Sequence, residues 1–379
     1  MKLSDEQCLI RDSVRDYVQN RIAPHAAEWD KSGHFPAEQL KEMGELGLFG
    51  MVIPEQWGGS ETGYVGFALA LEEVAAGDGS CSTILSVTNS VVCGSLLGSG
   101  SEYLKTQYLK PLASGQMLGC FCLTETQAGS DASALKTRAT REGDDYLLNG
   151  SKTFITSGKN AQVAIVFAVT DPQAGKKGIS AFVVPTDNPG YQVGTIEQKM
   201  GQHASDTAQV FLKDCRVPVD HRLGNEGDGY KIALMNLESG RIGIGAQSVG
   251  MARAAYEIAL AYAKERQTFG KPIIEHQAVA FRLADMATQL EAAHLMVINA
   301  ASLRDAGEPC LKQASMAKLF ASEAAEKICS SAIQVLGGYG YLKDFDLERI
   351  YRDVRISQIY EGTSDIQRIV IAREIGGQL

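Results

Sequence analysis

The sequence of 379 residues lacks the cysteine and histidine patterns of metal sites and disulfide frameworks. Its eight cysteines are scattered, without a CxxC pair, and its histidines form no cluster at zinc-ligand spacing. We therefore expect reduced, structural thiols and no bound metal.

Long apolar runs and a targeting segment are also missing. The apolar runs, such as residues 163–169, are far shorter than the roughly 18 residues that span a bilayer, so we expect no membrane helix. Asp5 and Glu6 precede a helical pattern, which matches neither a secretion signal nor an Arg-rich transit peptide. For the chain as given, we expect a cytoplasmic location.

Basic residues are also fewer than acidic ones, with 36 lysines and arginines against 45 aspartates and glutamates. The formal net charge is −9 at pH 7, and a polyanion requires a positive surface, so we expect no nucleic-acid partner. A few lysines, arginines or helix N-termini can still hold phosphates locally, which leaves a phosphorylated ligand open.

The sequence does contain enough apolar residues for a large folded protein. Hydrophobic residues make up 45% and charged residues 21%, and the length suggests two or three structural units. Helical periodicity dominates residues 1–118, short β-rich runs dominate residues 119–226, and helical periodicity returns over residues 227–379. The predicted class is α+β, with a β domain between two helical domains.

Local signals place the main elements. Ser4 to Gln7 reads as a capping box before a helix that Pro24 ends, and longer helices are expected at about 230–263, 276–306 and 312–336, with a last one from Ser364. The predicted strands are 136–141 and 146–148, joined as a hairpin, then 163–170, 179–185, 191–196 and 208–212.

Two segments in the β region could hold a ligand. In residues 121–131, Thr124 and Ser130 offer hydroxyls, and Gly129 lets backbone amides approach a planar or anionic ligand. Residues 154–156 place an aromatic ring before a hydroxyl at a strand end. A polar strand-to-loop junction and core packing are the alternative interpretations.

Two further segments lie near the C-terminus. Residues 334–341 contain three glycines after an apolar helix, which indicates either close approach to a ligand or subunit, or a simple helix end. In residues 359–365, Glu361 precedes Gly362 and an N-cap-like Thr-Ser-Asp. Alone, that pattern would be an ordinary solvated helix start.

Together and in this order, the four segments resemble the acyl-CoA dehydrogenase family over essentially the whole chain. Residues 121–131 resemble its Thr/Ser-Glu…Gly-Ser-Asp signature, and Gln334 through Arg349 to Asp353 resembles its glycine-rich signature. Residues 240–247 and 360–364 are similar to the short-chain (butyryl-type) or short/branched-chain branch.

The resemblance implies a fold and an assembly. The N-terminal domain would be all-α, the middle domain β-barrel-like and the C-terminal domain a four-helix bundle, usually in a homotetramer. FAD would lie between the β domain and the bundle, with part of it held across a subunit interface. The electron acceptor would be an electron-transferring flavoprotein.

The resemblance also assigns residues to FAD. Residues around the flavin ring would be Phe121, Cys122, Leu123, Thr124, Ser130, Phe154, Ile155 and Thr156. Residues at the adenine-dinucleotide part would be Arg266, Phe269, Gln277, Gln334, Val335, Leu336, Gly337, Gly338, Thr363, Ser364 and Asp365.

For the reaction, the resemblance makes Glu361 the base that takes the α-proton of an acyl-CoA while a hydride passes from Cβ to flavin N5. Residues expected at the substrate are Ser130, Glu238, Arg241, Gln247, Ser357, Tyr360 and Gly362. The product would be the trans-2-enoyl-CoA. Burial would strengthen the carboxylate as a base, and the Glu361 N–H with a ribityl hydroxyl would stabilise the enolate.

Some family members place the base just before Arg241, but Gly240 stands there and cannot act. Glu238 is the nearest carboxylate, and its spacing favours pairing with Arg241 or contact with substrate.

Three other positions depart from the family pattern. Phe154 replaces a common tryptophan, His203 replaces an arginine and puts a local ion pair in doubt, and Ser357 replaces the threonine of the short-chain branch.

Two rival functions stay open at this stage. One is an oxidase or monooxygenase on the same fold, although the acyl-CoA oxidases are much longer chains. The other is an acyl-CoA-binding protein without activity, which the presence of Glu361, Arg241 and both flavin segments disfavours.

Overall fold

The computed structural model describes residues 3–376, and it begins with a domain of helices. These helices are α1 (Asp5–Arg21), α2 (Ala26–Ser32), α3 (Ala37–Glu45), α4 (Gly63–Gly77), α5 (Gly79–Val87), α6 (Gly94–Ser99), α7 (Glu102–Leu104) and α8 (Lys110–Ala113). The predicted capping box is confirmed, since the Ser4 side chain accepts from the Gln7 N–H and the Gln7 side chain accepts from the Ser4 N–H.

Helices α5 and α6 are joined by a π-helical turn at Thr88–Cys93 into one apolar helix. By length and composition alone, this segment, Gly79–Ser99, could cross a membrane. However, 83% of its most apolar window is buried inside the protein. It is therefore packed as a core helix.

The middle domain is an eight-stranded mixed sheet. Its strands are β1 (Gly119–Cys122), β2 (Arg138–Glu142), β3 (Asp145–Thr156), β4 (Val163–Val169), β5 (Ile179–Pro185), β6 (Tyr191–Ile196), β7 (Thr207–Pro218) and β8 (Arg222–Leu223). The order is β6-β7-β3-β2-β4-β5-β8, and β1 pairs with β4 in parallel. The predicted hairpin is confirmed as β2–β3.

Strand β7 runs past the predicted end at residue 212. Residues 215–218 pair with the start of β3, after a register shift between Leu148 and Gly150. Asp214 in β7 has a positive φ of 45°. The alternating pattern is interrupted there, which explains why the sequence indicated a shorter strand.

Strands β4 and β5 are buried on both faces of the sheet. In β4, Val163, Ile165 and Phe167 pack with the N-terminal helices, whereas Ala164, Val166 and Ala168 face an interior shared with β1, β3 and β7. This burial accounts for the continuous apolar runs of β4 and β5.

The C-terminal domain contains the long helices. They are α9 (Gly229–Glu265), α10 (Gln277–Asp305) and α11 (Leu311–Leu336), followed by the shorter α12 (Leu347–Val354) and α13 (Ser364–Glu374). The predicted ranges differ from these by a few residues at most. A small hairpin of β9 (Gln267–Thr268) and β10 (Lys271–Pro272) joins α9 to α10.

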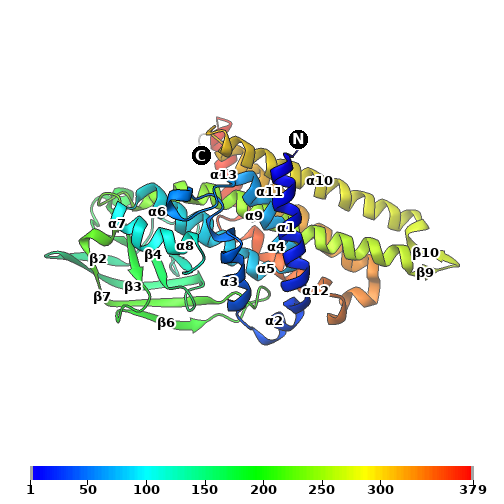
Figure 1. The fold of residues 1–379 in the computed structure, drawn as a ribbon, viewed down its shortest axis with the longest axis horizontal. Coiled ribbons are helices and arrows are strands. Elements are labelled where there is room, and N and C mark those ends of the chain that lie inside the picture. Colours follow the sequence, from blue (N-terminus) through cyan, green and yellow to red (C-terminus); the bar gives the residue numbers. More distant parts are fainter. Residues whose placement is uncertain (1–2, 377–379) are drawn as a thin grey trace.

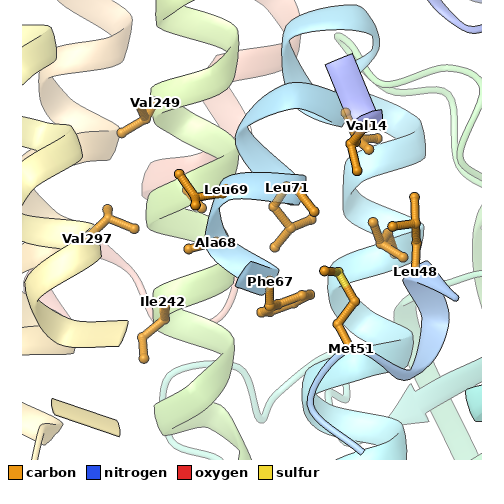
Figure 2. Packing of buried hydrophobic residues seen from close by; sticks show 14 of the residues in the cluster. Val14, Leu48, Met51, Phe67, Ala68, Leu69, Leu71, Ile242, Val249 and Val297 are labelled. Atoms are coloured by element: carbon orange, nitrogen blue, oxygen red, sulfur yellow. The ribbon is translucent and has the colours of Figure 1, made fainter. Parts of the chain in front are cut away.

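Helix α9 contributes to three of the hydrophobic cores. Its start packs with the sheet through Ile232, its middle packs with α4 through Ile242 and Val249, and its end lies in the core of α10–α12. Figure 2 shows side chains of α4, including Ala68 and Leu69, pointing toward α9 and toward Val297 of α10. The sheet lies at one end of the long axis and the β9–β10 hairpin at the other (Figure 1).

Candidate active site

Glu361 lies in a tight turn immediately before α13. Both Glu361 and Gly362 have left-handed backbones, with φ of 50° and 93°. For a non-glycine residue this conformation costs roughly 1–2 kcal/mol, so the surrounding structure must hold it. The Thr363 hydroxyl begins α13 by accepting from the Ile366 N–H at 3.3 Å.

The side-chain amide of Gln367 holds this turn from inside. Its Nε2 donates to the carbonyls of Glu361 and Gly362 at 3.3 and 2.9 Å. A Cβ at position 362 would lie 2.7 Å from the same nitrogen. Residue 362 therefore has to be glycine for both conformational and steric reasons.

The Glu361 carboxylate points at α9. Its Oε2 is buried and has no hydrogen-bond partner among the described residues. A Cβ added to Gly240 would collide with this oxygen. The alternative base position on α9 must therefore be glycine for Glu361 to occupy this place.

Two buried cations lie near the carboxylate. Lys318 of α11 is 0% exposed, and its Nζ donates to the Gly362 carbonyl at 2.8 Å. Arg241 of α9 is 6% exposed, and within the described chain its Nε and Nη1 are buried without a partner. Unpaired buried polar atoms are rare in folded proteins, and they commonly mark the place of a ligand.

Burial and these cations act against each other on the carboxylate. Loss of water raises the pKa of Glu361 to about 7, while Lys318 and Arg241 lower it. Burial also lowers the pKa of Lys318 to about 8, against the opposing charge of Glu361. The site thus contains a carboxylate that can take up a proton near neutral pH.

Glu238 is paired differently from the expected arrangement. Arg304 donates to its Oε1 at 3.3 Å, and the Cys310 thiol donates to the same oxygen at 3.3 Å. Glu238 thus pairs with an arginine at the end of α10 instead of Arg241, and its contact with substrate, the other expectation, stays a prediction. Arg241 is left free for a ligand.

Gln247 and Tyr360 are joined in a buried polar network next to Glu361. The Tyr360 hydroxyl donates to the Gln247 Oε1, and the Gln247 Nε2 donates to the Gly79 carbonyl and the Ser82 hydroxyl at 2.9 and 2.8 Å. Ser357 is also 0% exposed. The structure therefore brings these predicted substrate residues together in one region.

The two predicted flavin segments lie side by side in the β domain. The Thr153 N–H donates to the Thr124 carbonyl at 3.0 Å. Phe154 is 65% exposed and has a positive φ of 58°. Cys122 and Ile155 are buried in the core of the sheet, so they can offer a ligand only backbone atoms.

A buried ion pair supports the first flavin segment. Lys152 is 0% exposed, and its Nζ donates to Glu125 at 2.7 Å and to the Leu123 carbonyl at 3.2 Å. Glu125 also accepts from two backbone N–H groups at residues 136 and 137. Lys152 therefore holds the residues on both sides of Thr124 in place.

A pocket of about 420 Å³ lies at the other end of the bundle. Its lining brings together five predicted FAD residues: Arg266, Val335, Leu336, Gly337 and Gly338. Phe269 is 97% exposed on the turn of the β9–β10 hairpin, and Gln277 and Gln334 are also exposed. These three side chains are open to a partner.

The glycines after α11 have separate roles. Gly337 ends the helix with a φ of 62°, as the helix-end interpretation predicted. A Cβ at Gly340 would lie 2.6 Å from the Ile333 carbonyl, so this glycine is required by close packing. A Cβ added at Gly338 would meet no other atom within 4 Å.

His203 contacts Asp30 at the place where the sequence put an ion pair in doubt. Its Nδ1 lies 2.9 Å from a carboxylate oxygen of Asp30, and Arg352 also binds Asp30, at 2.7 Å. The histidine therefore still links the β domain to the N-terminal helices.

Sequence reasoning missed several residues of this region, namely Lys318, Gln367, Ser82 and Thr83. One signal was available for Lys318, because it lies on the same face of α11 as the buried Ala314 and Ala321. A charged residue on an apolar helix face indicates a specific partner. No comparable signal marked Gln367.

Comparisons with known proteins find matches to all three domains of the chain. Residues 4–116, 120–215 and 227–376 match the N-terminal, middle and C-terminal domains of acyl-CoA dehydrogenase. The chain is 46% identical to the mitochondrial short-chain specific acyl-CoA dehydrogenase of Rattus norvegicus over 372 residues, which covers 98% of this chain and 90% of the relative.

Two further similarities extend over the full length. The structure of butyryl-CoA dehydrogenase from Megasphaera elsdenii superposes with a TM-score of 0.97 at 40% identity, covering 99% of both chains. Subunit CarC of the caffeyl-CoA reductase-Etf complex of Acetobacterium woodii is 44% identical, covering 98% of both chains. The chain therefore belongs to the acyl-CoA dehydrogenase family of flavoprotein oxidoreductases.

Proposed function

We propose that this protein dehydrogenates a short or short/branched acyl-CoA to the trans-2-enoyl-CoA, with FAD as cofactor and Glu361 as the base. The observation that supports this most is the Glu361 Oε2, which is buried beside Arg241 and Lys318 and accepts no hydrogen bond in the described chain. An oxygen in this state is free to receive a proton.

The same turn can also stabilise the product of proton removal. A thioester α-hydrogen is only weakly acidic, so the enolate oxygen needs hydrogen-bond donors. Within residues 3–376, the Glu361 N–H has no acceptor. Glu361 would thus take the proton with its carboxylate and bind the thioester oxygen with its N–H.

The residues present fit FAD. Phe154 offers an exposed ring on a strained backbone, next to the partly exposed Thr124, and buried hydroxyls without partners, such as Ser364 Oγ, lie near the base. Bound here, FAD would supply the acceptor for the β-hydride, which no side chain can provide. The protein would hold the flavin at Thr124 and Phe154.

The pocket for the acyl chain should be short. Gln247 is fixed by hydrogen bonds to α5 and to Tyr360, so it cannot easily swing aside for a longer chain. Ser357, smaller than threonine, would leave slightly more room beside it. The similarity to short-chain specific and butyryl-CoA dehydrogenases supports this assignment.

An electron-transferring flavoprotein is the proposed acceptor of the electrons. The support is the 44% identity to a subunit whose name places it in a complex with Etf.

An anaerobic test separates the proposed dehydrogenase function from its rivals. A yellow protein that bleaches with acyl-CoA is a dehydrogenase, whereas a colourless protein that binds acyl-CoA is not an enzyme.

We also propose a homotetramer in which FAD is shared between subunits. The flavin segments lie in the sheet domain, and Arg266, Phe269 and Gln277 lie by the β9–β10 hairpin at the opposite end of the long axis (Figure 1). If both groups bind FAD, they must come from different subunits. This arrangement would couple assembly to cofactor retention.

The role of Glu361 as base predicts the effect of Glu361→Gln. The variant keeps the shape and the backbone N–H but cannot take the α-proton, so anaerobic flavin reduction should fall by ~10²–10⁴ while FAD content stays the same. Glu238→Gln tests the alternative carboxylate on α9 and should stay within about tenfold of the wild type, because Glu238 is paired with Arg304. A larger loss in Glu238→Gln than in Glu361→Gln would reverse the assignment.

The raised pKa of Glu361 predicts a pH-dependent gain in stability for the same variant. The pKa is about 7 in the folded protein against an ordinary 4.5, so the folded state binds more protons between these values. The free energy of unfolding of the wild type should therefore fall as pH rises through this window. Glutamine does not ionise, so the variant lacks this loss of stability. The difference in free energy of unfolding between Glu361→Gln and the wild type should therefore shift in favour of the variant by on the order of 1–3 kcal/mol between low pH and pH above 7. Urea unfolding of both holoproteins across this range checks it, and a difference independent of pH would contradict the raised pKa.

We propose that Gln247 and Ser357 close the end of the acyl pocket as a plug. This plug predicts the chain-length preference. Flavin reduction measured with straight and branched acyl-CoAs of increasing length should be fastest for short chains. Gln247→Gly should accept longer chains, and Ser357→Thr should trim the preference by one or two carbons, since a methylene is worth about 1–3 kcal/mol. If long-chain thioesters were already the best wild-type substrates, neither residue would act as a plug.

The shared cofactor predicts a concentration effect in Arg266→Ala. This variant should lose FAD, and should lose more of it on dilution, because the cofactor and the interface depend on one another. Lys264→Ala removes an exposed cation nearby and serves as the matched control. Retention of FAD that is independent of protein concentration in all three proteins would contradict the shared site.

A further inference from the structure

Lys318 is a buried lysine whose place in α11 needs a physical reason. Its neighbours Ala314, Ala317 and Ala321 are buried small residues, and Lys318 itself is 0% exposed. Burying an ammonium group costs several kcal/mol unless partners compensate. Within residues 3–376 its ammonium makes one hydrogen bond, to the Gly362 carbonyl at 2.8 Å, and no ion pair within 4.0 Å.

A second fully buried lysine shows what compensation normally looks like. Lys152 is also 0% exposed, but it forms an ion pair with Glu125 at 2.7 Å and a second hydrogen bond to the Leu123 carbonyl. Lys152 is thus satisfied as a structural group. Lys318 has two N–H groups left over, which makes a purely structural role a poor explanation.

The one hydrogen bond of Lys318 falls on the turn that presents the candidate base. The Gly362 carbonyl accepts from both the Lys318 Nζ and the Gln367 Nε2, at 2.8 and 2.9 Å. This carbonyl belongs to the second of two consecutive residues with left-handed backbones. Two donors on one oxygen therefore hold the strained turn in place from the side of α11 and from α13.

The charges around Lys318 come from three elements. Glu361 faces it from the turn, Arg241 from α9 and Glu323 from its own helix. The two cations both face Glu361, and neither forms an ion pair with it at 4.0 Å or less in the described structure. The carboxylate is therefore influenced by the positive charges while its Oε2 stays free.

We propose that Lys318 is a positioning residue for the α-proton abstraction: its ammonium holds the Glu361–Gly362 turn through the Gly362 carbonyl and places a positive charge near the Glu361 carboxylate. This rests on the proposed role of Glu361 as base. In support, Lys318 lowers the pKa of Glu361 more than Arg241 does, against the effect of burial.

The test separates the charge of Lys318 from its hydrogen bond. Lys318→Gln keeps an N–H donor on a slightly shorter side chain but carries no charge, and Lys318→Arg keeps the charge. Lys327→Gln removes an exposed charge from the same helix and is the matched control. Each holoprotein is titrated by infrared difference spectroscopy of the Glu361 carboxyl group, with Glu361→Gln as the blank, and by the pH dependence of flavin reduction.

In Lys318→Gln, the carboxyl titration should move up by about one to three pH units, since an opposite charge shifts a carboxylate by that much. The rate of flavin reduction should fall at least about tenfold at neutral pH and recover at high pH. Lys318→Arg should restore the wild-type profile, and Lys327→Gln should match it throughout. FAD content shows that each variant has folded.

A carboxyl titration and a rate profile that are both unchanged in Lys318→Gln would overturn the proposal. A rate that falls equally at every pH would overturn it too, because that is the effect of a merely structural residue. If the carboxyl titration moved but the rate profile did not follow, Lys318 would still act on Glu361, and it is Glu361 as the base that would be overturned.

Discussion

The Glu361 carboxylate is buried against α9, with one oxygen that accepts no hydrogen bond from the described residues, and much of the surrounding structure exists to allow this. A buried, unpaired carboxylate is costly, and its pKa of about 7 reflects that cost. Gly240 leaves the space for it, Gly362 makes the turn, and Lys318 and Gln367 hold the turn through backbone carbonyls. Stability is thus given up to hold a carboxylate that can take up a proton near neutral pH.

Helix α9 brings the required groups into register. It runs from the sheet domain through the core shared with α4 to the far end of the bundle. Along this one helix lie Gly240 beside the Glu361 carboxylate, the unpaired Arg241 and the buried Gln247. Small changes in how α4 or α11 packs against α9 should therefore alter the proposed base and the proposed acyl pocket together.

The helices could be predicted from sequence because their apolar periodicity is long and their ends carry caps, as at Ser4 and Thr363. Residues 121–131 and 359–365 could be found because the family signature fixes both residue type and order. The pairing of Glu238 could not, since spacing along one helix says nothing of Arg304 on another. Lys318 was marked only by its charge on an apolar helix face, and its partner could not be predicted because a backbone carbonyl has no residue-specific signal.

Removal of the α-proton by Glu361 is tested most directly without hydride transfer. An acyl-CoA analogue with sulfur in place of Cβ can lose an α-proton but has no β-hydride to give. Incubated in D₂O with the wild-type holoprotein, its α-protons should exchange with solvent, as mass spectrometry would show. Glu361→Gln should bind the analogue and leave its α-protons in place. Exchange at the wild-type rate in Glu361→Gln would contradict the account.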